Sequence, residues 1–326
     1  MSEPAHAHAP EVSIVVVSYN TREMTLECLR SVARETRAAH EVIVVDNASA
    51  DGSPEAIAAE FPTTVLIAEP VNHGFAPAHE IALKHVSAPW LLLLNPDTVV
   101  LNGALDTLLA FAKANPHAGI WGGRTLYPDG SLNPSSCWGR MTLWSLVCQT
   151  SGLSSVFRRS RFFNPEGYGG WQRDSVRDVD IVTGCLLLIR RSDWDALGGF
   201  DPIFRMYGEE ADLCLRARSK GLHPMITPEA EIIHYGGASE TVRADKVVRL
   251  LRAKMELIKR HFPVRSGTLG SALLTSWPLS RWLALSVASK VLLREDLGKK
   301  GIVWREIWRR REEWRHGFTA DAREHI

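Results

Sequence analysis

Two groups of carboxylates have neighbours that indicate chemistry. Asp97 ends the triplet Asn95-Pro96-Asp97, which directly follows four leucines, and Glu209 and Glu210 stand side by side later in the chain. A carboxylate at the end of a buried strand could hold Mg²⁺, which proteins bind through one or two carboxylates plus phosphate oxygens of the substrate. Adjacent carboxylates raise each other's pKa, which suits a general base that works near neutral pH. These residues therefore predict metal binding and proton abstraction.

Each group also has a purely structural interpretation. Asn, Pro and Asp all favour turns, so Asn95-Pro96-Asp97 could simply end a strand. Two acids in the first turn of a helix interact favourably with its dipole, which could account for Glu209 and Glu210. The choice between chemistry and structure depends on the elements that carry these residues.

Four apolar runs near the N-terminus predict buried strands. They cover residues 12–18, 41–45, 64–68 and 91–94 and are rich in Val, Ile and Leu. Stretches with helical spacing separate the runs, and alternating strands and helices form parallel sheets with right-handed crossovers. We therefore predict an α/β fold with a mostly parallel central sheet flanked by helices.

Each of the four predicted strands is followed by polar residues. The carboxyl ends of parallel strands lie at one edge of a sheet, where ligands bind, and a rim of amides and carboxylates there suits a nucleoside and its phosphates. The chain has neither GxGxxG nor GxxxxGK[ST], so a dehydrogenase or P-loop enzyme is not indicated, and a phosphate site would need a cation. The rim motifs are Ser18-Tyr19-Asn20, Asp46-Asn47-Ala48-Ser49-x-Asp51, Asn72-x-Gly74-Phe75 and Asn95-Pro96-Asp97.

These motifs resemble those of the inverting family 2 glycosyltransferases with the GT-A fold, especially the bacterial rhamnosyltransferase-like branch. In that branch an NPD triplet stands where other members carry a DxD metal motif. The resemblance continues in TG(A/C)xLxxRR around Gly184, in FDxxFxMYGExxDLCLR around Glu209 and Glu210, and in HxxGxS from His234. It implies a GT-A glycosyltransferase domain over residues 11–262.

The resemblance implies a role for each motif. Asp46 and Asp51 would hold the nucleobase and ribose of a nucleotide-sugar donor, and Asp97 and His234 would bind the divalent cation, Mg²⁺ or Mn²⁺, that bridges its diphosphate. The family usually has Asp as its catalytic base at the place of Glu210, so the base here would be Glu210, or Glu209 in its stead. The remaining predicted donor contacts are Ser18, Tyr19, Asn20, Asn47, Asn72, Gly74, Phe75, Asn95 and Gly184.

The implied reaction is inverting transfer of a sugar, with rhamnose from dTDP-rhamnose as the best prediction, to a hydroxyl of a lipid-linked cell-surface polysaccharide or glycolipid. After Gly74-Phe75 the chain has His79, Glu80 and Ala82, where the family usually has asparagines and a glycine. This departure leaves the identity of the donor sugar open, so a UDP-hexose or UDP-galactofuranose is an alternative donor. A nucleotide-sugar-binding module without catalysis is another, and it predicts binding without turnover.

Composition narrows the class of protein to which the chain can belong. The chain of 326 residues is 45% hydrophobic and has a net charge of +1, which is typical of globular proteins and gives no sign of nucleic-acid binding. Its five cysteines show no metal-ligand spacing and no disulfide framework. Residues 1–10 contain no apolar run typical of a secretory signal, so we expect a disordered tail on a cytoplasmic protein.

Other segments are interpreted structurally. The helix predicted for 209–219 places Asp212 and Arg216 four residues apart, where they form an ion pair. Residues 126–177 show no sustained periodicity, and aromatics such as Trp171 are assigned to packing.

The region 263–326 forms a separate C-terminal part. Its apolar stretch 269–293 contains Pro278 and charged residues, and it falls short of the roughly 20 apolar residues that a membrane-spanning helix needs. Beyond it, apolar and basic side chains recur at helical spacing, as in helices that lie at a membrane interface. We therefore predict peripheral binding to the cytoplasmic face of the plasma membrane; the alternative is packing on the protein's own domain or on a second subunit of a homo-oligomer. The stripe consists of Val303, Trp304, Ile307, Trp308 and Trp314 beside Arg305, Arg309, Arg310, Arg311 and Arg315.

Overall fold

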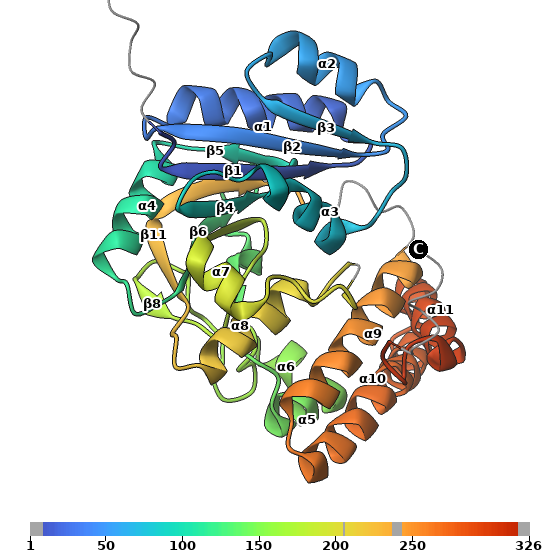
Figure 1. Cartoon of the computed structure of the whole chain (residues 1–326). Helices are drawn as coiled ribbons and strands as arrows, with labels where there is room; N and C mark the ends of the chain where they lie inside the picture. Colours follow the sequence, from blue (N-terminus) through green and yellow to red (C-terminus); the bar gives the residue numbers. More distant parts are fainter. Residues whose placement is uncertain (1–8, 205, 237–242, 319–326) are drawn as a thin grey trace, which may run out of the picture.

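A nine-stranded sheet forms the centre of the computed structural model, which describes residues 9–204, 206–236 and 243–318 (Figure 1). The strand order is β3-β2-β1-β4-β10-β6-β11-β5, and β8 pairs with β11. A separate small sheet joins β7 to β9. The strands are β1 (Val12–Ser18), β2 (His40–Asn47), β3 (Val65–Glu69), β4 (Trp90–Leu94), β5 (Thr98–Val100), β6 (Ile120–Leu126), β7 (Cys137–Trp138), β8 (Arg177–Asp178), β9 (Ile181–Val182), β10 (Leu186–Arg190) and β11 (Met225–His234).

The first half of the sheet is parallel, as the sequence predicts. β1 pairs in parallel with β2 and with β4, and β2 pairs in parallel with β3. β1 and β4 are buried along their whole length, because their Val, Ile and Leu side chains are covered on both faces. The four carboxyl ends therefore share one edge, and the predicted α/β fold is confirmed.

The second half of the sheet contains reversed strands that bring later parts of the chain to this edge. β10 runs antiparallel to β4 and pairs Leu186 with Leu94, so residues 183–185 lie beside the end of β4. β11 runs antiparallel to β5 and pairs His234 with Thr98. β9 and β10 are separate strands, with Gly184 between them at the edge of the sheet.

Helices cover both faces of the sheet (Figure 1). In β1, Ile14 and Val16 belong to a core with α1 and α4, whereas Val15 and Val17 belong to a core with α3 and α8. This alternation follows from the two-residue period of a strand. The helices are α1 (Arg22–Glu35), α2 (Ser53–Glu60), α3 (Phe75–Ala82), α4 (Ala104–Ala114), α5 (Leu143–Ser151), α6 (Leu153–Val156), α7 (Arg191–Leu197), α8 (Glu209–Ser219), α9 (Arg243–His261), α10 (Val264–Val291) and α11 (Glu295–Arg309), with short 3-10 helices η1 (Leu83–His85), η2 (Pro134–Ser136) and η3 (Arg311–Glu313).

The C-terminal helices pack on the rest of the chain through a third core. Ile307 and Trp314 are fully buried there together with Leu146 of α5 and Leu251 of α9. Trp304 packs in the same core, with its ring centroid 5.2 Å from that of Trp277. For these members of the predicted stripe the structure therefore shows the alternative, packing on the protein's own domain.

Pro278 does not end α10. The helix continues from Val264 to Val291 with Pro278 buried inside it. Hydrogen bonds from the Thr150 hydroxyl to the Leu273 carbonyl, 3.0 Å, and from the Ser280 hydroxyl to the Thr150 carbonyl, 2.7 Å, fix α10 to α5 on either side of the proline. No helix in the described ranges is both long enough and apolar enough to cross a membrane. Most of the expected N-terminal tail, residues 1–8, lies outside the described residues.

Candidate active site

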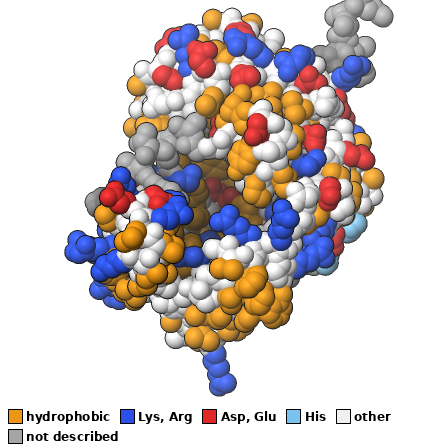
Figure 2. Space-filling view, turned by 180° about the vertical axis from the view of Figure 1, so that it is seen from behind, with side chains coloured by type: hydrophobic (Ala, Val, Ile, Leu, Met, Phe, Trp, Pro, Cys, Tyr) orange, Lys and Arg blue, Asp and Glu red, His pale blue; other side chains and the backbone are white. Residues whose placement is uncertain are grey.

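A pocket of about 470 Å³ lies at the carboxyl ends of the parallel strands, and Figure 2 shows the molecule hollowed near its centre. This volume lies in the range typical of sites for small ligands. The walls come from the ends of β1 and β2, from Asn95 to Asp97 directly after β4, from the start of α8 and from the end of β11. Eleven of the residues predicted from the sequence line the pocket: Tyr19, Asn47, Asn72, Gly74, Phe75, Asn95, Asp97, Gly184, Glu209, Glu210 and His234.

Asp97 and His234 meet because β5 and β11 are paired. Asp97 Oδ1 lies 3.4 Å from His234 Nε2, and Asp97 Oδ2 accepts a hydrogen bond of 3.1 Å from the Gly236 amide. The carbonyl of Asp97 accepts a further bond, 3.0 Å, from the Tyr235 amide. The carboxylate is therefore held rigidly at the pocket wall with one oxygen directed at the imidazole.

Burial and the neighbouring groups shift the pKa values of Asp97 and His234 in opposite directions. Burial alone would raise the pKa of Asp97, but the hydrogen bond and charge of His234 lower it more. Burial would lower the pKa of His234, but Cys185 and Asp97 raise it to about 11. The neighbouring carboxylate therefore favours the protonated form of the imidazole. A metal ion would replace the proton, because imidazole binds metals in its neutral form.

The donor atoms at this place fit a hard divalent cation. Beside the Asp97 oxygen and the His234 nitrogen, the pocket wall carries the Asn95 side-chain oxygen, which is buried without a hydrogen-bond partner. In the part of the chain that the structure describes, no group of three or more His, Cys, Asp and Glu side chains is arranged so that it could hold a metal ion by itself. The protein would therefore supply few ligands and leave positions for phosphate oxygens, as Mg²⁺ sites commonly do.

Glu209 and Glu210 face the pocket from the first turn of α8. The helix begins there because Gly208 adopts φ 95°, a conformation that favours glycine. An Oε2 atom of each carboxyl group is buried without a hydrogen-bond partner. Burial raises the pKa of both groups, and the charge of Glu210 raises the pKa of Glu209 further. This arrangement can bind and release a proton at the pocket wall.

Gly184 separates Glu210 from Phe75. A Cβ atom at Gly184 would lie 3.7 Å from the Phe75 ring and 3.8 Å from the Glu210 Cβ, so a longer side chain would enter the space between them. Behind Phe75, the His79 ring lies with its centroid 4.4 Å from the Phe75 centroid, and His79 Nδ1 donates to the Phe75 carbonyl over 2.8 Å. Burial lowers the pKa of His79 to about 4. His79, one of the departures from the family pattern, is thus a neutral packing residue.

The loop after β3 is fixed by side-chain amides. Asn47 Nδ2 donates to Asn72 Oδ1, 2.9 Å, and to the Gly74 carbonyl, 3.1 Å, while Asn47 Oδ1 accepts from the His73 amide, 2.9 Å. Gly74 has φ 88° and begins α3. The amide side chains that were predicted as donor contacts therefore also shape the wall that carries Phe75.

Four predicted residues do not line the pocket: Ser18, Asn20, Asp46 and Asp51. Asp51 Oδ2 accepts from the Arg22 amide over 2.9 Å and so caps α1 from another loop, while Thr21, at the N-cap, makes no capping bond. Asn20 accepts from the Ala50 amide over 2.8 Å, and the buried Ser18 hydroxyl lies 3.0 Å from that of Thr25.

Asp46 differs from the other three. It is 1% exposed, and its Oδ1 accepts from the Ser49 amide over 2.9 Å, but its Oδ2 has no hydrogen-bond partner. A buried carboxylate oxygen without a partner is costly, so it is available to a ligand donor group.

The sequence reasoning missed several pocket residues that come from distant segments. Asn133 and Ser135 flank Pro134 in the aperiodic region, and Asn133 Nδ2 donates to the His234 carbonyl over 3.2 Å. Lys246 reaches the pocket from α9, and Tyr127 and Tyr207 also line it. The polar run from Asn133 to Ser136 and the basic character of α9 were visible, but nothing local connected them with the rim.

Comparison with known proteins settles the family. The model of the family described as Glycosyl transferase family 2 matches residues 13–195, which is more than half of the chain and includes the strands that form the rim. The chain belongs to glycosyl transferase family 2. Its α/β fold and its rim of polar residues are those expected from the resemblance.

Relatives of this family 2 glycosyltransferase include rhamnosyltransferases. It is 29% identical over 236 residues to the N-acetylglucosaminyl-diphospho-decaprenol L-rhamnosyltransferase of Mycobacterium tuberculosis, which covers 68% of this chain and 75% of that protein. It is 40% identical over 172 residues to the rhamnosyltransferase WbbL of Escherichia coli K12, which covers 50% of this chain and 61% of that protein.

Solved structures show the same fold. The mannosyltransferase PcManGT from Pyrobaculum calidifontis, in complex with GDP-Man and Mn²⁺, superimposes with a TM-score of 0.57 at 17% identity, covering 92% of this chain and 85% of that one. At this identity the likeness concerns the fold, and it agrees with the GT-A architecture predicted from the sequence.

Proposed function

We propose that this glycosyltransferase moves rhamnose from dTDP-rhamnose, with inversion at the anomeric carbon, to a hydroxyl of a lipid-linked saccharide. The observation that carries the proposal is one pocket containing both the Asp97–His234 pair and the Glu209–Glu210 pair. The donor and acceptor are supported by the relatives, which are named for rhamnosyl transfer, one of them onto an N-acetylglucosaminyl-diphospho-lipid.

The nucleoside would bind at the ends of β1 and β2. Asp46 offers its unpartnered Oδ2 to a donor group of the base or ribose, and Tyr19, 40% exposed at the pocket wall, offers an aromatic face. Asp51 and Asn20 act on this region by holding the loops after β1 and β2 together, and Ser18 contacts Thr25 at the start of α1.

Asp97 and His234 would hold a divalent cation, Mg²⁺ or Mn²⁺, with Asn95 beside them. When bound, such a cation offsets the negative charge that develops on the departing diphosphate. The structural neighbour PcManGT was solved with Mn²⁺, which supports this assignment. Asp97, fixed by Gly236 and Tyr235, would keep the leaving group near the end of β4.

Glu210 would act as the base. It would take the proton of the acceptor hydroxyl while the hydroxyl oxygen attacks the anomeric carbon on the side opposite the diphosphate. Glu209 would stay protonated, because the charge of Glu210 and its own burial raise its pKa. A single displacement of this kind inverts the anomeric configuration.

We place the reaction at the cytoplasmic face of the plasma membrane, in a protein bound there peripherally. A lipid-linked acceptor lies in the bilayer and its saccharide at the surface, so an enzyme that reaches the surface without spanning it meets both substrates. The absence of a membrane-crossing helix in the described ranges fits this peripheral arrangement.

The experiment is nucleotide release from dTDP-, UDP- and GDP-sugars, each with an N-acetylglucosaminyl-diphospho-lipid acceptor, in Mg²⁺, in Mn²⁺ and in chelator. We expect release from dTDP-rhamnose alone, lost in chelator and in Asp97→Ala. Asp296→Ala, on the surface of α11, is the matched control and should keep full activity. Release from a UDP-sugar instead would contradict the proposed donor, and binding of every nucleotide without turnover would favour the non-catalytic module.

A further inference from the structure

Two segments that are distant in sequence contain no acidic residue. Between Asp129 and Glu166, and again between Glu256 and Glu295, the chain has no Asp or Glu but ten Lys and Arg. The whole chain has a net charge of only +1, so the rest of it is net negative. The positive charge of the molecule is therefore concentrated in residues 130–165 and 257–294.

The fold brings these two segments together. α5 in the first packs on α10 in the second, where a Cβ atom at Gly270 would lie 3.3 Å from Leu146 Cδ1. Farther along, Arg281 Nη2 donates to the Ser155 hydroxyl over 2.8 Å and so connects α10 with α6. We call the combined surface of residues 130–165 and 257–294 the basic surface.

The basic surface also carries most of the exposed apolar groups. Of the eighteen large hydrophobic side chains that are exposed in the described residues, eleven belong to it. Figure 2 shows hydrophobic side chains gathered at the foot of the molecule with a basic side chain projecting below them, where Figure 1 places α5 and α6. The eleven are Trp144, Val156, Phe157, Phe162, Val264, Leu269, Leu283, Val287, Val291, Leu292 and Leu293.

Aromatic and basic side chains alternate most closely after α6. Phe162 is 63% exposed, with its ring centroid 4.8 Å from that of Trp144, and Val156 is 73% exposed. Arg158, Arg159 and Arg161 lie between these apolar residues and are exposed as well. Aromatic rings and arginines in such proximity suit the boundary between lipid head groups and acyl chains.

We propose that the basic surface docks the enzyme on a bilayer of anionic lipids. Exposed arginines such as Arg158, Arg159 and Arg161 match the negative head groups, and the exposed rings match the interface below them. A second copy of this chain would present the same positive charge and repel it. The inference rests on the proposed function only for its biological use, because docking requires neither donor nor acceptor.

This surface differs from the stripe that the sequence predicts. Ile307 and Trp314 of that stripe are buried in the third core and cannot reach a membrane. The basic surface instead combines α5, α6 and α10, of which the first two lie far from the C-terminus in sequence.

The test is co-sedimentation of the full chain with vesicles of phosphatidylcholine, with and without phosphatidylglycerol, in the absence of substrates. We expect binding only to the anionic vesicles, and its loss at high salt. Arg158→Glu/Arg159→Glu and, separately, Phe157→Ser/Phe162→Ser should weaken binding about tenfold or more. Arg34→Glu/Arg37→Glu on the α1 side and Val71→Ser, also exposed, are the matched controls and should bind like the wild type.

Three outcomes would overturn the proposal. They are equal binding to both vesicle types, variants of the basic surface that bind as well as the wild type, and a dimer in light scattering that Phe157→Ser/Phe162→Ser dissociates, which would assign the surface to a second copy. Because the assay contains no sugar donor, a failure here is distinct from a failure of the proposed glycosyl transfer.

Discussion

Glu209 and Glu210 share the first turn of α8, but their surroundings differ. Glu209 is only 4% exposed, and the charge of Glu210 adds to the burial that raises its pKa. The raised pKa of Glu210 comes from burial. The protonated form of each therefore persists above the ordinary glutamate range.

The first prediction concerns the pH dependence of transfer. Because a base must be ionised, kcat/KM should fall as the pH falls through the raised pKa of Glu210, at a pH above the usual 4.5 of a glutamate. Glu210→Gln should lower kcat by about 10²–10⁴-fold, the usual contribution of a general base. In Glu209→Gln the fall of kcat/KM at low pH should remain, because burial is what raises the pKa of Glu210. If Glu209→Gln instead lost the activity and Glu210→Gln kept it with its fall at low pH, Glu209 would be identified as the base.

Single residues could be predicted where a motif and a strand end coincide. Asp97 and Asn95 follow the leucine strand, and the structure places both at the pocket wall. Asp51 also follows a strand, but its carboxylate caps α1, because the β2–α2 loop folds back on the helix. Lys246 and Asn133 reach the pocket only through tertiary packing, which no local pattern records.

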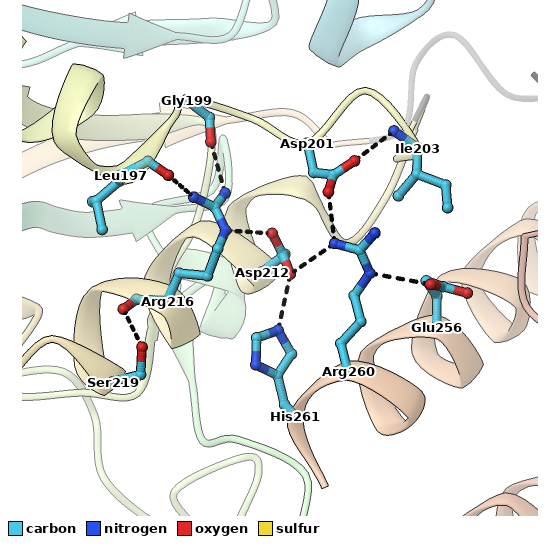
Figure 3. A network of polar contacts seen from close by, with 10 residues as sticks. All are labelled: Leu197, Gly199, Asp201, Ile203, Asp212, Arg216, Ser219, Glu256, Arg260 and His261. Carbon is cyan, nitrogen blue, oxygen red and sulfur yellow. Dashed lines mark hydrogen bonds and ion pairs between the residues drawn. The ribbon is translucent and has the colours of Figure 1, made fainter.

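At the scale of elements, Asp212 joins α8 to its surroundings (Figure 3). Its side chain is fully buried, and it accepts from Arg216 Nε over 2.7 Å and from His261 Nε2 over 2.9 Å. Arg260 of α9 lies 3.7 Å from the same carboxylate and donates to Asp201 over 2.7 Å. The predicted Asp212–Arg216 pair is confirmed, and it is part of a larger network that fixes the helix carrying the two glutamates.

The second prediction is that Asp212→Asn destabilises the fold by about 3 kcal/mol at neutral pH, because a buried charge cluster loses its only fully buried carboxylate. Burial would raise the pKa of Asp212, but His261 and Arg216 lower it more. The ionised form is therefore favoured by folding, and its stabilisation is present above the usual pKa of 3.8 and lost as the pH falls below it.

Urea unfolding at several pH values measures this effect. The difference in unfolding free energy between wild type and Asp212→Asn should be large at neutral pH and shrink in acid. Asp296→Asn, whose carboxylate is exposed beside Arg294, serves as the control and should stay within about 0.5 kcal/mol of the wild type. An unchanged stability of Asp212→Asn at neutral pH would show that the network is not needed to hold α8.

At the scale of the whole molecule, three cores hold the chain together. Two lie on the faces of the sheet, and the third joins α5 and α9 to α10 and α11. Trp314 is fully buried in the third core, and its Nε1 donates to the Ile307 carbonyl over 3.2 Å. The sequence predicts a separate C-terminal part from residue 263, whereas the contacts of α9 reach both sides of that boundary.

The third prediction follows from this shared core. Trp314→Ala should lower the unfolding free energy by about 3–5 kcal/mol through loss of buried volume, within a single transition that includes the sheet. Trp308→Ala, which removes a partly exposed ring from the end of α11, is the control and should cost much less. A new, separate transition at low urea in Trp314→Ala would show that the C-terminal helices unfold independently.

The parallel half of the fold was predictable because Val, Ile and Leu runs separated by helical stretches have few other arrangements. The pairing of the reversed strands β10 and β11 with β4 and β5 depends on contacts between distant segments, which no local pattern indicates. The Trp and Arg stripe had two interpretations, because amphipathic helices look alike whether they face lipid or their own protein. The burial of Ile307 and Trp314 against α5 and α9 decides between the two interpretations, and it is seen only in the folded structure.

The measurement that tests the central claim most directly is the anomeric configuration of the product, determined by NMR after transfer from the donor that the release assay identifies. One displacement at the anomeric carbon, with Glu210 taking the hydroxyl proton, predicts a product of the opposite configuration to the donor, and transfer by Glu210→Gln that is slower by about 10²–10⁴-fold. A product that retains the donor configuration, or undiminished transfer by Glu210→Gln, would contradict the assigned role of the glutamate pair.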